Sequence, residues 1–401
     1  MAPVNATTAY QQLQCAPGYT SNLCAACEPW HYINAEFECR RVFPLQVAIV
    51  HAQYYIIIVR LPVAYPSDMA KLSGALSAVT GAESAIAYSY SCFFPADASD
   101  GQARTQLLGA LLVPFAVIAT SMLVWGVSSN FYRVLSQADA TLGLSTQLWV
   151  MGVIAVFILY PGWAQAALSV FACYKIDDGQ TGLYPQNQKA AWRHGYWVRD
   201  MAQQCYTGVH LRLYVPIGIA AVAVLCLGPP LASFVILWHH RAALGSKNVR
   251  QRYSFLYARY KPRFFWWESV LMLEELALVA VEVFGRGLKS VTHQILVMLA
   301  SFIVISAINI SCRPTRLRVI TMLEFMSMTV LSLTVSLSLF FVVDEGLSAT
   351  DERPVGVLIL AINVVLLVTF LGVLLRGSWG KLRGIASQAH RVALAALMRG
   401  K

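Results

Sequence analysis

Long apolar stretches constrain this chain more than any other feature. Crossing the hydrocarbon core of a bilayer takes a helix of about 20 apolar residues, and none of these stretches shows the alternation typical of strands. A segment in lipid must satisfy its own backbone hydrogen bonds, so each stretch is predicted to be a helix. The predicted spans are 106–127, 146–171, 211–238, 266–284, 290–310, 319–343 and 354–375. Prolines inside three of them predict kinks: Pro114, Pro161, Pro216 and the pair Pro229–Pro230.

Composition supports this class and excludes a soluble protein. Hydrophobic residues make up 57% of the 401 residues and charged residues only 12%, about half the share in soluble domains. Aromatic residues at 11% exclude a disordered chain. The predicted fold is an all-α, polytopic transmembrane helical bundle whose main partner is the lipid bilayer.

Basic residues predict the orientation of the bundle. The segment 239–265 carries seven Lys or Arg and no acidic residue, and loops of this kind stay in the cytoplasm. Counting spans from there places 311–318 and the tail after 375 in the cytoplasm, whereas the acidic loop 344–353 and the N-terminus lie outside. The net charge of +10 is then explained by loops rather than by nucleic-acid binding. We expect the plasma membrane rather than an organelle.

Most cysteines fall in segments predicted to lie outside, where disulfides persist. The disulfide candidates are Cys15, Cys24, Cys27, Cys39, Cys92, Cys173 and Cys205. Cys226 and Cys312 lie in or beside helices and are expected to be inert thiols. Asn5 begins a glycosylation sequon on the same outer side, so a glycoprotein is expected.

Residues 1–41 are predicted to form a small EGF-like extracellular module stapled by disulfides. A zinc site at Cys24-x-x-Cys27 is the alternative, but it needs a second cysteine pair, and only Cys39 follows nearby. Spacing leaves the disulfide connectivity open. No signal peptide pattern precedes the module, so we expect 1–41 to be the remnant of a longer ectodomain.

The segment 43–66 allows two interpretations. It is apolar from Val47 to Val59, but His51, Gln53 and Arg60 interrupt it. As an eighth span it would place the cysteine module in the cytoplasm; otherwise it lies along the outer leaflet or re-enters the membrane. The predicted organisation is therefore the module at 1–41, an ambiguous membrane-associated segment and outer loop at 42–105, a transmembrane domain at 106–376, and a cytoplasmic amphipathic tail at 377–401.

Several phrases resemble, in their order, the TRP-like C-terminal membrane domain. This family includes fungal flavin-carrier and polycystin-like proteins, and algal and protist proteins with cysteine-rich ectodomains. The phrases are Gln53-Tyr54-Tyr55 with Val63-Ala64-Tyr65-Pro66 and Cys92; Tyr160-Pro161 with Phe171-Ala172-Cys173; Asp200, Cys205 and His210; Tyr257 and Tyr260-Lys261-Pro262 with Trp266-Trp267-Glu268; and Arg313-Pro314 with Leu323-Glu324-Phe325.

The resemblance covers roughly residues 43–376, and it implies a helix before 43–66 that this chain lacks. It also implies a cation channel subunit assembled as a homo-oligomer. One departure is Glu274-Glu275, because the family usually places basic residues there. The alternatives are a seven-helix receptor or signalling protein, and a lipid or small-solute transporter of the flavin-carrier kind.

The span 266–284 carries the strongest candidates for an ion path. Glu268, Glu275 and Glu282 are seven residues apart and share one helix face. Charges in mid-membrane are costly, so Glu274 and Glu275 need a partner or a wet cavity. They predict a cation site or proton relay; the alternative is neutral carboxyls, or a structural pair with a basic side chain.

Other intramembrane polar residues are expected chiefly to join helices by hydrogen bonds. These are His293, Gln294, Asn309 and Asn363. The basic loop 239–265 is a candidate contact for anionic lipid. We find no phosphate loop, nucleophile elbow or metalloprotease motif. The sequence therefore predicts no enzyme activity, catalytic residue, cofactor or metal.

Overall fold

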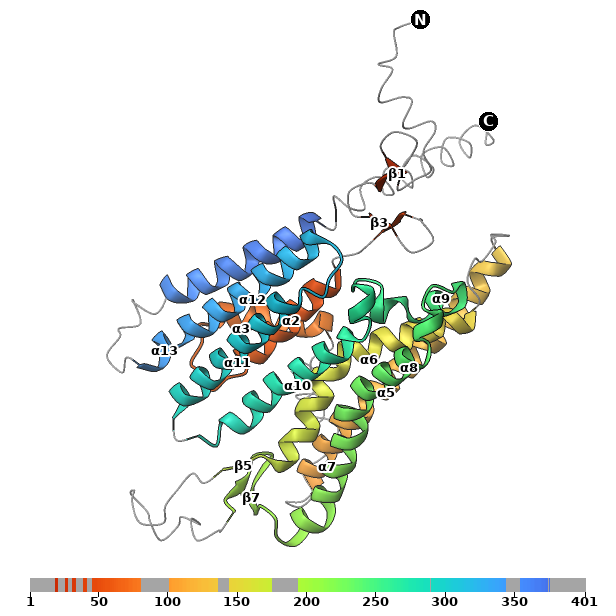
Figure 1. Ribbon diagram of the computed structural model, residues 1–401. Coiled ribbons are helices and arrows are strands. Elements are labelled where there is room, and N and C mark those ends of the chain that lie inside the picture. The colour runs from red at the N-terminus through yellow and green to blue at the C-terminus, as the bar shows by residue number, and fades with distance from the viewer. Residues whose placement is uncertain are drawn as a thin grey trace, which may run out of the picture.

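In the computed structural model, long helices run side by side between two ends of a bundle (Figure 1). The described residues are 45–80, 101–135, 144–174, 194–288, 290–343, 354–373 and 375, with four short strands before them. Six helices or helical runs are long and apolar enough to cross a membrane: Gln106–Ser128, Leu144–Phe171, His210–His239, Val291–Cys312, Arg318–Val342 and Pro354–Val373. The chain is thus a multi-pass integral membrane protein, and the predicted all-α bundle is confirmed.

The helices follow the predicted spans closely. In chain order they are α2 (Leu45–Val59), α3 (Ser67–Thr80), α5 (Gly101–Leu135), α6 (Leu144–Leu168), α7 (Val215–Ala221), α8 (Gly228–His239), α9 (Lys247–Tyr257), α10 (Trp267–Gly285), α11 (Val291–Cys312), α12 (Arg318–Ser338), α13 (Phe340–Val343) and Pro354–Val373. The strands are β1 (Tyr19–Thr20), β2 (Ala26–Cys27), β3 (His31–Ile33), β4 (Cys39–Arg41), β5 (Cys173–Tyr174), β6 (Tyr196–Trp197) and β7 (Asp200–Gln204). The seventh predicted span is α10, which carries four glutamates and is not among the six.

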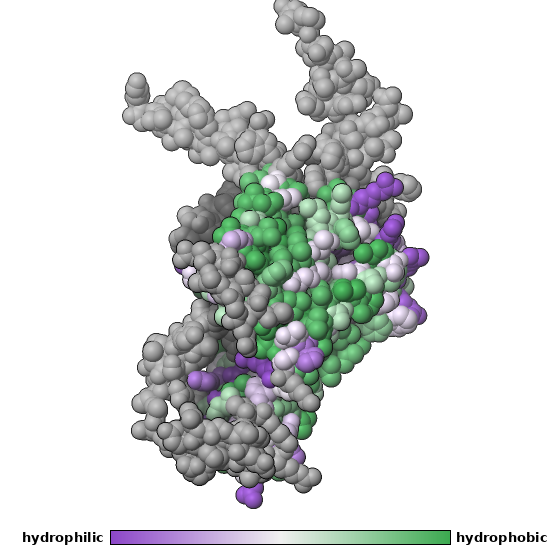
Figure 2. Space-filling view, turned by 90° about the vertical axis from the view of Figure 1, so that its left-hand side faces the viewer, coloured by the Kyte–Doolittle hydropathy of each residue, from purple (hydrophilic) through white to green (hydrophobic). Residues whose placement is uncertain are grey.

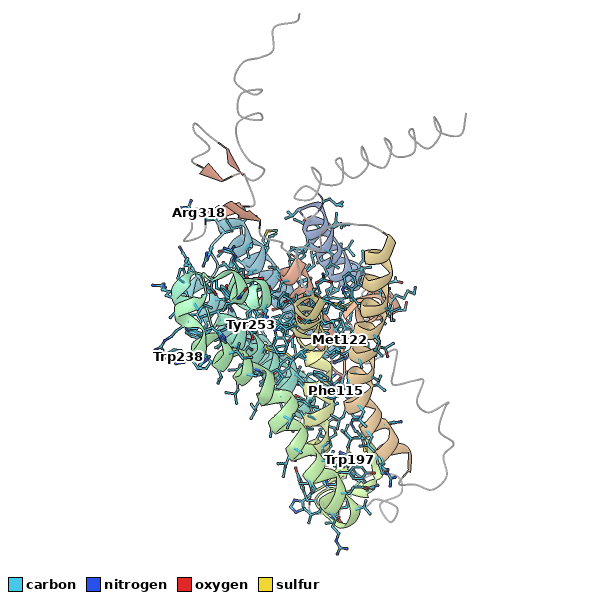
Figure 3. All side chains as sticks on the ribbon, turned by 90° about the vertical axis from the view of Figure 1, so that its right-hand side faces the viewer. Phe115, Met122, Trp197, Trp238, Tyr253 and Arg318 are labelled. Atoms are coloured by element: carbon cyan, nitrogen blue, oxygen red, sulfur yellow. A yellow bond between two sulfur atoms is a disulfide. The ribbon has the colours of Figure 1, made fainter. Side chains whose placement is uncertain are left out.

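We name the two ends of the bundle by their chemistry. The arginine end comprises the loops 239–266 and 313–317, which pair through a bond from the Lys261 N–H to the Pro314 carbonyl at 2.8 Å. The disulfide end comprises β5, β6 and β7, where Cys173 is bonded to Cys205. Figure 3 shows Arg318 and Trp197 at these opposite ends.

Helix α2 settles the ambiguity at 43–66, because it runs the length of α10. At the arginine end the Gln46 amide donates to Glu268 at 2.6 Å. Beyond the other end of α2, Arg286 donates to the carbonyl of Arg60 at 3.0 Å. Residues 51–58 are all buried. Helix α2 therefore crosses the bundle as an additional helix, surrounded by protein rather than lipid.

The position of α2 also indicates where the N-terminal strands lie. Strand β4 ends at Arg41, and the few residues before Leu45 are too few to cross the bundle. The N-terminal strands thus lie at the arginine end (Figure 1), whereas the sequence predicted the module 1–41 and the basic loop on opposite sides. Their backbone forms two antiparallel ribbons, β1–β2 and β3–β4. Asn5, Cys15, Cys24, Cys92 and the tail 377–401 lie outside the described residues, as do the side chains of Cys27 and Cys39.

Prolines leave backbone acceptors that side chains of other helices satisfy. Pro161 has no N–H for the Phe157 carbonyl one turn earlier, and the Gln53 amide of α2 donates to this carbonyl at 3.2 Å. Pro230 likewise leaves the Cys226 carbonyl, to which the Tyr160 hydroxyl donates at 2.7 Å. The run 210–239 also widens into π-helical turns at His210–Tyr214 and Val222–Leu227, which precede Pro216 and Pro229.

The outer surface is apolar, as expected for contact with lipid. Figure 2 shows hydrophobic side chains gathered over the middle of one face, with hydrophilic ones toward the ends. On the helical run 210–239, Val224, Leu231 and Val235 are each at least 60% exposed. Aromatic rings fill the interior instead: Tyr54, Trp163 and Phe302 are almost fully buried.

Candidate functional site

One face of α10 carries three carboxyl groups through the interior of the bundle. Glu268, Glu275 and Glu282 are each at most 1% exposed, and α10 packs against α2, α6, α8 and α11. Two helical turns separate successive members, a rise of about 10 Å. We call this set the carboxylate column. Its three members share a helix face but differ in their partners.

Glu268 lies at the arginine end of the column and is fully partnered. One oxygen accepts from Gln46 at 2.6 Å, and the other accepts from the Tyr260 hydroxyl at 2.9 Å. Arg259 is 7% exposed and places a guanidinium nitrogen 3.7 Å from the second oxygen. Burial raises the pKa of the Tyr260 hydroxyl well above its usual value, so this group stays protonated and remains a donor.

Glu282 occupies the other end of the column. Arg286, one turn later, donates to it at 3.3 Å, and the Gln165 amide of α6 lies 3.5 Å from the same oxygen. Arg286 is partly exposed, so Glu282, although buried, is bonded to a side chain that reaches the surface. A guanidinium therefore stands at each end of the column, Arg259 at one and Arg286 at the other.

Glu275 is the middle member, and neither of its oxygens has a hydrogen-bond partner among the described residues. An unpaired carboxylate at this depth would cost several kcal/mol. Of the nearby hydroxyls, that of Tyr54 also lacks a partner, whereas that of Tyr160 donates to the Cys226 carbonyl. The site therefore favours a proton or another cation at Glu275.

Glu274 points away from the column, into a separate cavity. The Asn309 amide of α11 donates to its two oxygens at 3.0 and 3.3 Å. The cavity has a volume of about 60 Å³ and lies between α2, α10, α11 and α12. Its polar lining includes Arg259, Glu274, Asn309 and Glu324. The adjacent glutamates predicted as one site thus belong to two.

The remaining sequence candidates lie elsewhere. His293 is at the exposed start of α11, where its ring nitrogen is 2.6 Å from the Ser290 hydroxyl. Gln294 is buried and donates to the Glu282 carbonyl at 2.9 Å. Asn363 donates to Thr334 at 2.9 Å and joins the last span to α12. These three side chains connect or cap helices and do not line the column.

Sequence reasoning missed His51, Arg259 and Glu324. In the sequence His51 interrupts the apolar stretch 43–66, but the side chain is fully buried and its ring nitrogen lies 2.9 Å from the Ser327 hydroxyl. Arg259 was counted only as a loop charge, and Glu324 only as part of a family phrase. The available signal was their position relative to the predicted spans, since Arg259 lies in the loop before 266–284 and Glu324 lies less than two turns inside 319–343.

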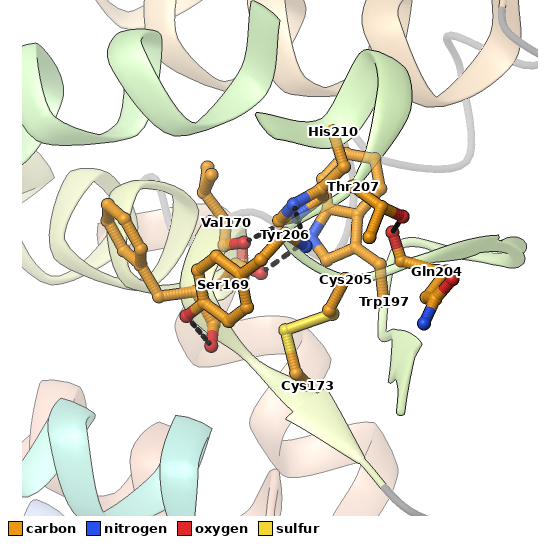
Figure 4. The surroundings of a disulfide bond; sticks show 10 residues. Ser169, Val170, Cys173, Trp197, Gln204, Cys205, Tyr206, Thr207 and His210 are labelled. Carbon is orange, nitrogen blue, oxygen red and sulfur yellow. Dashed lines mark hydrogen bonds between the residues drawn. A yellow bond between two sulfur atoms is a disulfide. The ribbon is translucent and has the colours of Figure 1, made fainter. Parts of the chain in front are cut away.

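The disulfide end is a tightly bonded cluster (Figure 4). The Trp197 indole donates to the Ser169 carbonyl at 3.1 Å, and its ring centroid lies 4.5 Å from that of Tyr214. His210 accepts from the Tyr206 N–H at 3.0 Å, so its other nitrogen donates to the Val170 carbonyl at 3.1 Å. Cys173, Cys205 and His210 lie close enough to suggest a metal, but the sulfurs are bonded to each other and both ring nitrogens are used.

Comparison with known proteins gives one partial similarity to report. Cysteine repeat modular protein A of Toxoplasma gondii is 26% identical to this chain over 133 residues, which are 32% of the chain and 4% of that protein. The chain therefore matches only a small fraction of that relative's length. No family model matches, and no solved structure matches. The similarity agrees with the expectation of cysteine-rich protist relatives.

Proposed function

We propose that this chain is a TRP-like, cation-conducting channel subunit that assembles as a homo-oligomer in the plasma membrane. The observation that carries the proposal is the carboxylate column. Its middle member, Glu275, is buried without a partner among the described residues, and an ionisable group at membrane depth is by default a candidate for ion or proton movement. The resemblance to the TRP-like family supports the same activity.

The proposed orientation places the arginine end in the cytosol and the disulfide end outside. Two independent features support it: loops rich in Lys and Arg stay in the cytoplasm, and disulfides persist in oxidising compartments. On this orientation the N-terminal strands and their cysteines face the cytosol, because they lie at the arginine end. The basic loop 239–265 can then contact anionic lipid of the inner leaflet.

Conduction along the column would proceed between the two guanidinium-bearing ends. Glu268 and Glu282 have hydrogen-bond partners, whereas Glu275 has none among the described residues. Removing the charge of Glu275 should therefore block cation movement along the column. We expect the Glu275→Gln protein, reconstituted in liposomes, to lose most cation or proton flux. Asp68→Asn is the matched control, because Asp68 is an exposed acid on α3 paired with Lys71 at 2.8 Å.

Flux should be measured for protons and for potassium on protein that elutes as the same oligomer. Unchanged flux in Glu275→Gln with a stable oligomer contradicts the role of the column. A wild-type protein that is monomeric and carries no flux contradicts the channel itself.

A transporter is the second candidate, favoured by the position of the column inside a single chain. Channels of this class surround a shared axis with several subunits, whereas the column lies among α2, α6 and α10 of one subunit. A saturable, countertransport-type flux from a monomer would favour this reading over the channel.

A further inference from the structure

The cavity beside Glu274 has the composition of a binding site. Its volume of about 60 Å³ exceeds the roughly 10–15 Å³ that one water needs. Its lining contains charged side chains that are more than nine-tenths buried, Arg259 and Glu274. Tyr54 also lines it and is 1% exposed, with a hydroxyl that has no partner among the described residues. Buried polar groups of this kind are normally satisfied, which points to a ligand.

The charges around the cavity favour a cation. Arg259 lies between two acids, 3.7 Å from Glu268 and 4.0 Å from Glu324. Glu274 is bonded by the neutral amide of Asn309. Two carboxyl groups, Glu274 and Glu324, thus line the cavity with one guanidinium, and Glu324 is beyond hydrogen-bond distance of it. A positively charged group between Glu274 and Glu324 would compensate both acids.

The mouth of the cavity is apolar. Ile310 of α11 and Phe325 of α12 line it and are 43% and 51% exposed. Met322, one turn from Phe325, is 67% exposed on the same helix. Ile310 and Phe325 thus give the cavity an exposed apolar border between α11 and α12.

A bound metal ion fits this cavity less well. No group of three or more acidic, histidine or cysteine ligand atoms lies within 4.8 Å there among the described residues. Divalent ions take six or more oxygen ligands in compact geometry. An organic ammonium instead needs only two or three acceptors, and it can carry an apolar tail into the mouth.

We propose that this cavity binds an amphiphilic amine, with its ammonium group between Glu274 and Glu324 and its apolar tail over Ile310 and Phe325. The ligand can be a free long-chain amine or a lipid with a primary-amine headgroup, since both present the same chemistry. The inference can be tested apart from ion conduction, because Glu274 lines the cavity and Glu275 does not.

The test is binding of dodecylamine to the purified full chain in nanodiscs made of phosphatidylcholine, with dodecanol as the uncharged probe. We expect saturable binding of the amine and none of the alcohol. Glu274→Gln and Glu324→Gln should each weaken binding roughly tenfold or more, the effect of losing a charge-assisted bond. Asp68→Asn, an exposed acid outside the cavity, should leave it unchanged.

Ile310→Trp tests the same cavity without changing a charged group, because it only narrows the mouth. The proposal therefore stays testable if the charge variants misfold. It should weaken binding of dodecylamine but not of a short amine such as ethylamine. Replacing phosphatidylcholine by phosphatidylethanolamine identifies the source: competition with dodecylamine assigns the site to lipid headgroups, and lack of competition assigns it to free amines. Equal binding of dodecylamine and dodecanol, or equal binding by all variants, overturns the proposal.

Discussion

The two ends of the bundle are fastened by opposite chemistries. At the arginine end, Arg259, Tyr260 and Glu268 form a buried charged network. At the disulfide end, a covalent bond joins Cys173 to Cys205. Charged networks are sensitive to the loss of any one member, whereas a disulfide acts mainly by restricting the unfolded chain. The ends should therefore fail under different conditions, and each can be perturbed alone.

The largest effect is expected from Arg259→Met. It leaves Glu268 and Glu324 without their cation, and breaking a buried ion pair costs about 3–5 kcal/mol. Thermal unfolding in detergent should show the loss. Adding Glu268→Gln should restore much of it, since the pair is then removed together. Arg263→Met is the control, because Arg263 lies on an exposed turn 4.5 Å over the Phe264 ring; a loss as large there would contradict the network's importance.

Reduction of the disulfide should cost somewhat less. The bond closes a separation of 32 residues, and disulfides of this kind contribute about 2–4 kcal/mol. Reductant, or Cys173→Ser with Cys205→Ser, should lower the unfolding temperature, whereas Cys312→Ser should not. The two ends are distant, so the reductant effect should add to that of Arg259→Met. A strongly non-additive result would show that the ends are coupled.

The smallest effect tests packing near the disulfide end. A Cβ on Gly285 would lie 2.5 Å from the Gln294 side chain, which bonds the Glu282 carbonyl. Gly285→Ala should destabilise by about 1–3 kcal/mol through overpacking. Gly74→Ala on α3 meets no atom within 4 Å and should stabilise the helix by about 0.5–1 kcal/mol. Equal changes in the free energy of unfolding for the two Gly→Ala variants would exclude close packing at Gly285.

Hydropathy predicted the helices well because a lipid-facing helix must be apolar along its whole length. The stretch 290–310 corresponds to Val291–Cys312, and 354–375 to Pro354–Val373. The heptad spacing of Glu268, Glu275 and Glu282 also predicted their shared face correctly, since α10 is an unbroken helix.

Helix α2 shows where this reasoning stops. In the sequence His51 and Gln53 interrupt an apolar span, but in the structure they contact α12 and α6 inside the bundle. A helix enclosed by protein can carry polar groups. Helix α2 is also short, since its 15 residues reach only about 22 Å. Single-sequence patterns describe how a segment meets solvent or lipid, but they do not identify its neighbours. The Asn309 partner of Glu274 was hidden for the same reason.

The carbonyls exposed by Pro161 and Pro230 have a further consequence. Apolar side chains slide past one another at little cost in free energy. Apolar packing alone therefore defines the rotation and axial position of a helix only loosely. The hydrogen bonds from Gln53 and Tyr160 join α6 to two neighbouring helices at fixed positions along its axis. Rotating or shifting α6 by a single residue would break both hydrogen bonds. The bonds therefore select one register of α6 among the many that apolar contacts alone would allow.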